Sequence, residues 1–309
     1  MKDTIQSTVV VGAGAIGASI ATRLADAGHR VFVSARGTRA LRYQKEGFVV
    51  NGKQYFLPVL DGHKAESADL VIVAVKNYSL HEAIIEMRPY VGADTIILSL
   101  LNGVDAVPKL RGEFGSDAVP HAMIIGIDAH RRGNEIQYSA KGQIFCGYEK
   151  ELAQRNAEKL ARLDRLFRES DIIFRVPDDI VREIWFKFMI NVSINQWSAV
   201  LGFPYRVFQS SPHAVALLEK TMQEVIALAP RMDIALSDAD IPRAMAVLKT
   251  LGPDGKTSML QDVEAHRRTE VEAFAGAMVR LAQAVGIEVP INAMLYEAIL
   301  AREDSYQVQ

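Results

Sequence analysis

The residues with the clearest chemical potential form a polar stripe in the apolar segment "REIWFKFMINVSINQWSAV", residues 182–200. Lys187, Asn191 and Asn195 recur there at every fourth position, and residues four apart lie on one stripe of a helix. A lone lysine would more simply extend its ammonium to solvent, with the asparagines bonded to nearby backbone. A buried ammonium needs either an anion or a wet cleft beside it. Since two amides line up with Lys187 on the same stripe, we favour a polar cleft over a lysine that reaches bulk solvent.

The third predicted helix, 258–286, could supply a partner for this ammonium. Glu270, in "RRTEVEAF", offers a complementary carboxylate, although spacing alone does not distinguish it. Ser258-x-x-Gln261 is typical of a helix capping box, which gives Ser258 a structural alternative.

A glycine motif near the start of the chain predicts a dinucleotide site. In "STVVVGAGAIG" an apolar run precedes Gly12-x-Gly14-x-x-Gly17, and a helical pattern and a second apolar run, 31–33, follow. In that setting the first glycine permits the tight turn, the second lets backbone amides approach a pyrophosphate, and the third lets the helix pack on the strand. The alternative is a glycine-rich turn without a ligand, but the strand–turn–helix context favours the Rossmann-type fingerprint.

The end of the second apolar run indicates which nicotinamide cofactor binds. An NAD site usually has Asp or Glu there to hold the ribose 2′-hydroxyl. Here the sequence is "VFVSARGTRALR", without a carboxylate and with Arg36 in the acid's place. A guanidinium pairs bidentately with a 2′-phosphate, so the sequence favours NADP(H). Arg39 and Arg42, which follow, also fit a solvated basic loop.

The first half of the chain alternates between strand and helix patterns. Apolar runs at 68–75 and 94–100, and a further strand at 117–127, indicate a parallel sheet covered on both faces. Between the first two runs, Ser79-x-x-Glu82 predicts a capping box. Residues 134–148 predict two antiparallel strands with a turn near Lys141-Gly142.

The second half contains helix patterns at 178–200, 213–233 and 258–286, separated by loops at 202–212 and 252–256. Pro177 lies between the last strand pattern and the first helix. The expected architecture is therefore α/β: an N-terminal Rossmann-type parallel-sheet domain, 1–176, followed by an all-α C-terminal domain, 177–309.

Composition limits the other classes of function. The chain has 309 residues, 49% hydrophobic and 23% charged, with a formal net charge of −2. This balance argues against binding to nucleic acid or to an anionic membrane. No apolar run is long enough to span a bilayer, and no signal peptide or zinc-site spacing is evident. One cysteine, Cys146, excludes an internal disulfide and fits a reducing cytoplasm. The seven histidines are scattered, so no metal is expected.

Separated motifs make the chain resemble the ketopantoate reductase (2-dehydropantoate 2-reductase) family over nearly its full length. They are "GAGAIG", "VAVK" ending in Lys76, Asn102-Gly103, "KFMINVSIN" and "SMLQDVEAHRRTE". The resemblance implies NADPH-dependent reduction of 2-dehydropantoate to pantoate, in pantothenate and coenzyme A biosynthesis. It departs at Leu101 and Ser79, where the family often has glutamine.

The resemblance also implies roles for individual residues. Lys187 would be the general acid: hydride delivery to a ketone leaves an alkoxide that needs a proton, and a lysine in a partly desolvated cleft has a lowered pKa and can donate one near neutrality. Glu270 would contact the substrate hydroxyl, and the ammonium with its amide donors suits a carboxylate-bearing substrate. The helical domain would supply most of the substrate site and a possible homodimer contact. The implied substrate-binding residues are Asn102, Asn191, Asn195, Ser258 and Glu270. The implied contacts of NADP(H) are Gly12, Gly14, Ala15, Ile16, Gly17, Arg36, Lys76 and Asn102.

Three alternatives remain open. One is a reductase for a different 2-oxo acid. Another is a β-hydroxyacid dehydrogenase, although those enzymes usually carry Gly-Gly one turn before the lysine, where this chain has "EIWF". The last is a non-catalytic NADP(H) sensor, which would have no reason to keep Lys187 together with its amides and Glu270.

Overall fold

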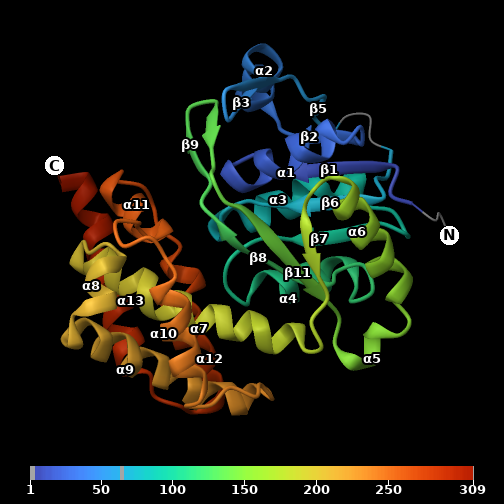
Figure 1. The fold of residues 1–309 in the computed structure, drawn as a ribbon. Helices are drawn as coiled ribbons and strands as arrows, with labels where there is room; N and C mark the ends of the chain where they lie inside the picture. The colour runs from blue at the N-terminus through green and yellow to red at the C-terminus, as the bar shows by residue number, and fades with distance from the viewer. Residues whose placement is uncertain (1–3, 63–65, 309) are drawn as a thin grey trace. The chain divides into compact units, whose positions relative to one another are not determined.

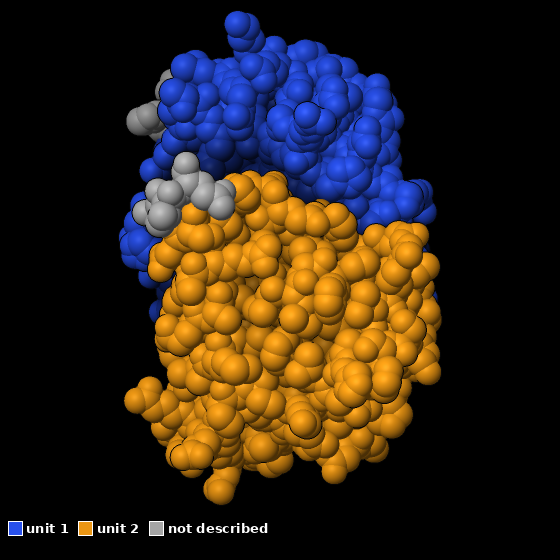
Figure 2. Space-filling model, turned by 90° about the vertical axis from the view of Figure 1, so that its left-hand side faces the viewer, with its two compact units in different colours: residues 1–102, 106–180 blue, residues 103–105, 181–309 orange. Residues whose placement is uncertain are grey.

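The structure, a computed structural model, describes residues 4–62 and 66–308. Contacts divide the chain into two compact units, which Figure 2 distinguishes by colour. The first unit comprises residues 1–102 and 106–180, and the second comprises 103–105 and 181–309. Each unit is described by itself below.

The first unit is built on a five-stranded parallel sheet with strand order β5-β2-β1-β6-β7 (Figure 1). Its centre is β1, so the chain turns outward to β2 on one side and to β6 on the other. This order creates a topological switch point at the carboxyl end of β1, where ligands bind in open α/β sheets. The strands are Ser7–Val11 (β1), Arg30–Ser34 (β2), Val59–Leu60 (β5), Leu70–Val73 (β6) and Ile96–Ser99 (β7).

Side-chain alternation along the strands gives the sheet a core on each face. Val10 packs into one core with helix α1 (Ala15–Asp26), whereas its neighbours Val9 and Val11 pack into the other with α3 (Leu80–Met87) and α4 (Ala106–Phe114). Strands buried on both faces read as continuous Val/Ile runs, which explains the apolar sequence pattern. The predicted parallel sheet covered on both faces is confirmed, but the strand expected over 117–127, His121–Ile127 in the structure, lies in a different sheet.

Two smaller sheets complete the first unit, in the orders β4-β3-β10-β9 and β12-β11-β8. Their strands are Phe48–Val50 (β3), Lys53–Tyr55 (β4), His121–Ile127 (β8), His130–Arg132 (β9), Glu135–Gln137 (β10), Lys141–Gly147 (β11) and Ile173–Arg175 (β12). The other helices of this unit are Gly37–Glu46 (α2), Lys150–Ala153 (α5) and Ala157–Glu169 (α6).

The expectation that residues 134–148 form an antiparallel pair is wrong. Strand β10 pairs with β3 and β9, whereas β11 pairs with β8 and β12. The carboxylate of Asp128, just after β8, accepts hydrogen bonds from the backbone of Ser139 and Ala140, each 2.8 Å long. These bonds direct the chain from β10 towards β8, and so β11 joins a different sheet.

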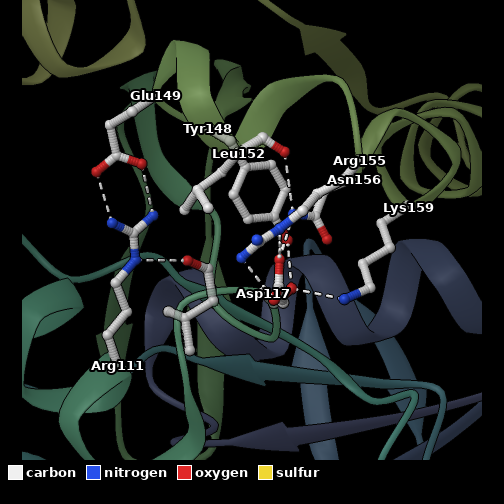
Figure 3. Close-up of polar contacts among 9 residues, drawn as sticks. Arg111, Asp117, Tyr148, Glu149, Leu152, Arg155, Asn156 and Lys159 are labelled. Atoms are coloured by element: carbon white, nitrogen blue, oxygen red, sulfur yellow. Dashed lines mark hydrogen bonds and ion pairs between the residues drawn. The ribbon is translucent and has the colours of Figure 1, made fainter.

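A dense polar cluster in the first unit surrounds Asp117 and Glu149 (Figure 3). The Asp117 carboxylate accepts from Arg155 at 2.6 and 2.7 Å and from Asn156 at 2.7 Å, and Glu149 accepts from both terminal nitrogens of Arg111 at 2.6 and 3.0 Å. The backbone next to Asp117 bonds to Ile97, near the start of β7. The cluster therefore lies by the amino end of β7, away from the carboxyl ends of the strands, and it fastens α5 and α6 to the sheet.

The second unit is helical, and α7 (Ile180–Leu201) is its central element (Figure 1). Trp185, Phe188, Met189 and Val192 recur at i, i+3, i+4 and i+7 and share one face of this helix, and Ile194, on the opposite face, also belongs to the core. The other helices are Tyr205–Ser210 (α8), Pro212–Leu228 (α9), Asp240–Lys249 (α10), Ser258–Glu264 (α11), Ala275–Val285 (α12) and Pro290–Val308 (α13). Within the described residues, no helix is long and apolar enough to cross a membrane.

Two sequence expectations fail in the second unit. The segment 202–212 is not only a loop, because it contains α8. The expected long helix over 258–286 is broken: α11 ends at Glu264, and His266 has a left-handed backbone with φ of 51°. The following turn is held by Glu303 of α13, which accepts hydrogen bonds from Thr269 N at 2.8 Å and Thr269 Oγ1 at 2.6 Å. These tertiary bonds override the helical pattern.

Candidate active site

The glycine turn between β1 and α1 is required by its own packing. Gly12 has φ of +93°, and a Cβ added there would lie 2.8 Å from the carbonyl of Ala74. A Cβ on Gly17 would lie 2.0 Å from the carbonyl oxygen of Gly12. Side chains at these two positions are excluded by backbone atoms, so both glycines are needed for the turn and for the approach of α1 to the sheet.

Gly14 differs, because the protein's own atoms do not exclude a side chain there. Its φ is −70°, and an added Cβ would meet only the carbonyl oxygen of Ala74 at 3.9 Å. Gly14 is the N-cap of α1, and Ala15 and Ile16 are the first residues of that helix, whose amides have no acceptor within it. The first turn contains no acidic residue. A bare helix amino end of this kind fits a pyrophosphate.

The loops after β6 and β7 bring two further predicted cofactor residues to the same edge of the sheet. Lys76 follows β6 and Asn102 follows β7, and both side chains are partly buried. Asn77 Nδ2 donates to the Asn102 carbonyl at 2.9 Å, so the two loops are joined. Because parallel strands end at one edge, the glycine turn, Lys76 and Asn102 share it.

The two departures from the family pattern have structural explanations in the first unit. Leu101 is only 6% exposed and belongs to the core beneath α3 and α4, which an apolar residue suits. Ser79 occupies the N-cap position of α3 but its side chain makes no capping bond. The predicted capping box with Glu82 is therefore wrong, because a 3-10 turn, Asn77–Ser79, precedes the helix directly.

Arg36 lies where the sequence analysis expects the 2′-phosphate partner. It is the exposed N-cap of the ten-residue helix α2, and a Cβ added to Gly62 would lie 3.0 Å from Arg36 Nη2. A guanidinium beside a helix amino end is a favourable setting for an anion. The two later arginines are engaged elsewhere: Arg39 donates to Glu86 at 3.1 Å, and Arg42 lies 5.5 Å from the centre of the Tyr43 ring.

In the second unit, α7 carries the predicted polar stripe. Lys187 and Asn191 are partly buried, and Asn195 is buried with 7% of its surface exposed. Burial lowers the pKa of Lys187 to about 8, and the negative charge of Glu270 partly opposes this shift. The structure therefore brings Lys187 and Glu270 together, although 83 positions of sequence separate their numbers.

Glu270 and Ser258 occupy different local settings from those that the sequence suggests. Glu270 is 4% exposed and lies at the N-cap of a short 3-10 turn, Val271–Ala273, and not within a long helix. The N-cap of α11 is Thr257, whose Oγ1 accepts from Leu260 N at 3.1 Å. The capping role considered for Ser258 is wrong, so its exposed hydroxyl is not used as the helix cap.

The sequence analysis missed the residues that fix α7. Gln196, next to Asn195, is fully buried; its Nε2 donates to Asn292 Oδ1 at 3.2 Å, and its Oε1 accepts from Ala275 N at 3.1 Å. These bonds link α7 to the amino ends of α12 and α13. No local signal identifies Gln196, because its partners lie 79 and 96 positions away.

The described residues contain no group of three or more His, Cys, Asp or Glu side chains that could hold a metal ion.

The fold and the glycine turn define a dinucleotide-binding protein with a helical second unit. Family comparison is more specific. The model "Ketopantoate reductase PanE/ApbA" matches residues 8–151, and "Ketopantoate reductase PanE/ApbA C terminal" matches residues 179–303. The chain belongs to the ketopantoate reductase family, whose cofactor is NADP(H), and the resemblance found in the sequence is confirmed.

Individual relatives agree with this assignment. The 2-dehydropantoate 2-reductase of Pyrococcus abyssi is 28% identical over 299 residues, which cover 95% of this chain and 97% of the relative. The PanE/ApbA family ketopantoate reductase of Ralstonia eutropha has a TM-score of 0.85 at 25% identity, covering 97% of this chain and 99% of that one. A D-mandelate dehydrogenase, solved with NADH and anilino(oxo)acetate, shares the fold with a TM-score of 0.87 at 21% identity and the same coverage.

Proposed function

We propose that this protein reduces 2-dehydropantoate to pantoate with NADPH, as a step of pantothenate and coenzyme A biosynthesis. The observation that carries the proposal is the desolvated ammonium of Lys187, which lies near the buried carboxylate of Glu270. Lys187 is on α7, the same helix that carries Asn191 and Asn195. The P. abyssi relative, named for this reaction over nearly the whole length of both chains, supports the choice of substrate.

In the proposed mechanism, the carbonyl carbon of the 2-oxo acid would receive the hydride that NADPH supplies when bound. Lys187 Nζ donates a proton to the carbonyl oxygen as its negative charge develops, which yields the 2-hydroxy acid and a neutral lysine. Glu270 favours the charged form of the lysine before the reaction and accepts a hydrogen bond from the substrate hydroxyl. Asn191, Asn195 and Ser258 orient the substrate, and this orientation supplies much of the catalysis.

The first domain, residues 1–176, is proposed to bind the cofactor. Backbone amides at Gly14, Ala15 and Ile16 would hold the pyrophosphate, and Gly12 and Gly17 would keep the turn in shape. Arg36 would pair with the 2′-phosphate, which selects NADPH over NADH. Lys76 would contact the ribose, and Asn102 would lie near the nicotinamide.

The second domain, residues 177–309, is proposed to bind the substrate. A homodimer through this domain stays a prediction, which sedimentation of the purified protein would test.

The experiment that tests the function follows NADPH oxidation with a panel of 2-oxo acids that includes 2-dehydropantoate. We expect the highest kcat/KM with 2-dehydropantoate. A higher value for an aromatic or unbranched 2-oxo acid would assign the chain to the alternative, a family member with a different 2-oxo acid substrate. NADPH binding without turnover of any carbonyl compound would instead favour a cofactor sensor.

A further inference from the structure

The residues after Asn102 are fastened to the turn that carries Glu270. Gly103, Val104 and Asp105 belong by their contacts to the second unit, although the chain on both sides of them belongs to the first. Gly103 has φ of +84°, and a Cβ added there would lie 2.9 Å from the carbonyl oxygen of Ala273. Ala273 ends the 3-10 turn that begins directly after Glu270, so only glycine permits this close approach.

Arg280 of α12 bonds to both of these segments. Its Nη2 donates to Asp105 Oδ2 and to the carbonyl oxygen of Glu272 at 3.3 Å, and its Nη1 donates to Glu272 Oε2 at 3.4 Å. Tyr296 of α13 donates to the other oxygen of Glu272, Oε1, at 2.6 Å. One guanidinium therefore joins the loop after Asn102 to the turn after Glu270, and α13 holds that turn from the other side.

The cluster is accommodated by a second glycine. A Cβ on Gly276 would lie 2.7 Å from Glu272 Oε2 and 3.1 Å from Arg280 Nη1. The side chain of Arg280 is 50% exposed, so its ion pairs add little to global stability. An arginine that contacts two acidic side chains and a carbonyl, beside the Gly103 position where a Cβ would meet a backbone carbonyl, is more specific than a surface ion pair.

We propose that Arg280 is a positioning residue for the reaction. It fixes the three residues that follow Asn102 against the three that follow Glu270, all within the second unit, and so holds the turn after Glu270 in place. This proposal rests on the proposed function for the role of Glu270. Because a misplacement of about 1 Å costs up to about a hundredfold in rate, loss of Arg280 lowers kcat without loosening the nucleotide site.

The test compares Arg280→Met with Arg280→Lys and with a matched control, Arg168→Met. Arg168 is an exposed arginine of α6 that is also paired with a carboxylate, that of Asp164, but in the first unit. We expect Arg280→Met to lower kcat about 10-fold to 100-fold and to change the Kd of NADPH less than about threefold. Arg280→Lys keeps the positive charge but not the several N–H donors of the guanidinium, so it should retain more of the wild-type kcat than Arg280→Met. Arg168→Met should match the wild type.

A second measurement does not depend on turnover. Hydrogen exchange of the peptides that span 102–106 and 268–274 is expected to accelerate in Arg280→Met and in Asp105→Asn, but not in Arg168→Met. The double variant with Asp105→Asn should be no slower in turnover than Arg280→Met alone, because both changes break the same contact.

Unchanged exchange together with unchanged kcat in Arg280→Met would overturn the proposal. A fall confined to the affinity for NADPH would overturn it as well, because it would place Arg280 in cofactor binding. If Arg280→Met does not fold, Asp105→Asn alone decides by the same two readouts. If the wild type reduces no 2-oxo acid, the proposed function fails. Hydrogen exchange would still test whether Arg280 holds residues 103–105 against residues 271–273.

Discussion

The lowered pKa of Lys187 makes a quantitative prediction about pH. Burial brings this pKa to about 8, whereas an unperturbed lysine titrates at about 10.4. Only the ammonium form can donate a proton, so activity is lost as the pH rises through this pKa. The protonated share falls from about 0.9 at about pH 7 to about 0.1 at about pH 9, which predicts a tenfold fall in kcat/KM over that interval.

Two variants connect this alkaline limb to named groups. Lys187→Ala should lower kcat by about 10²–10⁴, the usual range for a positioned general acid, and should lose the limb, with little change in the Kd of NADPH. Glu270→Gln removes the negative charge that raises the pKa of Lys187, so the limb should move to lower pH. In Glu270→Gln, the pH at which activity falls is informative, whereas the absolute activity is not, because Glu270 is also expected to bind substrate.

The assay is NADPH oxidation with 2-dehydropantoate, measured from neutral to alkaline pH in buffers of equal ionic strength. Lys220→Ala, which changes an exposed lysine of α9, is the control and should keep the wild-type profile. An alkaline limb near the ordinary lysine value, a near-normal kcat in Lys187→Ala, or a limb that moves upward in Glu270→Gln would each refute the reasoning.

Three further predictions concern the first unit. Arg36→Asp should raise KM for NADPH by at least about tenfold while changing KM for NADH little, since it replaces the 2′-phosphate partner with a repelling charge; equal effects on both cofactors in steady-state kinetics would contradict this. Gly14→Ala should keep the thermal stability but weaken NADPH binding in titration calorimetry, whereas Gly17→Ala should destabilise the fold by about 1–3 kcal/mol or more in urea unfolding, because its Cβ would meet a carbonyl at 2.0 Å. Burial alone would raise the pKa of Glu149, but hydrogen bonds from His121 and Arg111 outweigh it and hold the pKa well below its usual range. This ionised carboxylate stabilises the fold above its unfolded pKa of about 4.3, and the contribution is lost as the pH falls through the lower folded value, so Glu149→Gln should reduce the acid dependence of the unfolding free energy.

The parts of the fold that the sequence predicts are those that local patterns determine. The glycine fingerprint specifies β1, the turn and α1, because backbone atoms exclude a side chain at each of its outer glycines: those of Ala74, just after β6, at Gly12, and those of Gly12 at Gly17. The continuous apolar runs specify the central strands, because both faces of a parallel sheet are buried. The order of the smaller sheets does not follow from local pattern, since it depends on bonds such as those of Asp128 to the chain after β10.

The candidate site divides in the same way. The stripe of Lys187, Asn191 and Asn195 lies on one helix and is visible as a four-residue spacing. Glu270 is not, because it faces the lysine only after α11 has ended at Glu264 and the chain has turned. A long uninterrupted helix over 258–286 would have carried the carboxylate on a regular face. The left-handed His266 and the bonds from Thr269 to Glu303 place it instead, and neither is encoded by periodicity.

The two failed capping boxes bear on function. A serine that caps a helix has its hydroxyl committed to a backbone amide, and both Ser79 and Ser258 fit the capping pattern in sequence. In the structure neither makes that bond: a 3-10 turn precedes α3, and Thr257 takes the capping position of α11. Thr257 is itself buried and contacts the hydroxyl of Ser198 on α7, so the cap and the helix that carries Lys187 are joined. The start of α11 is thus positioned by Thr257, and the exposed residue Ser258 is not used as the cap, which is consistent with the substrate-orienting role proposed for it.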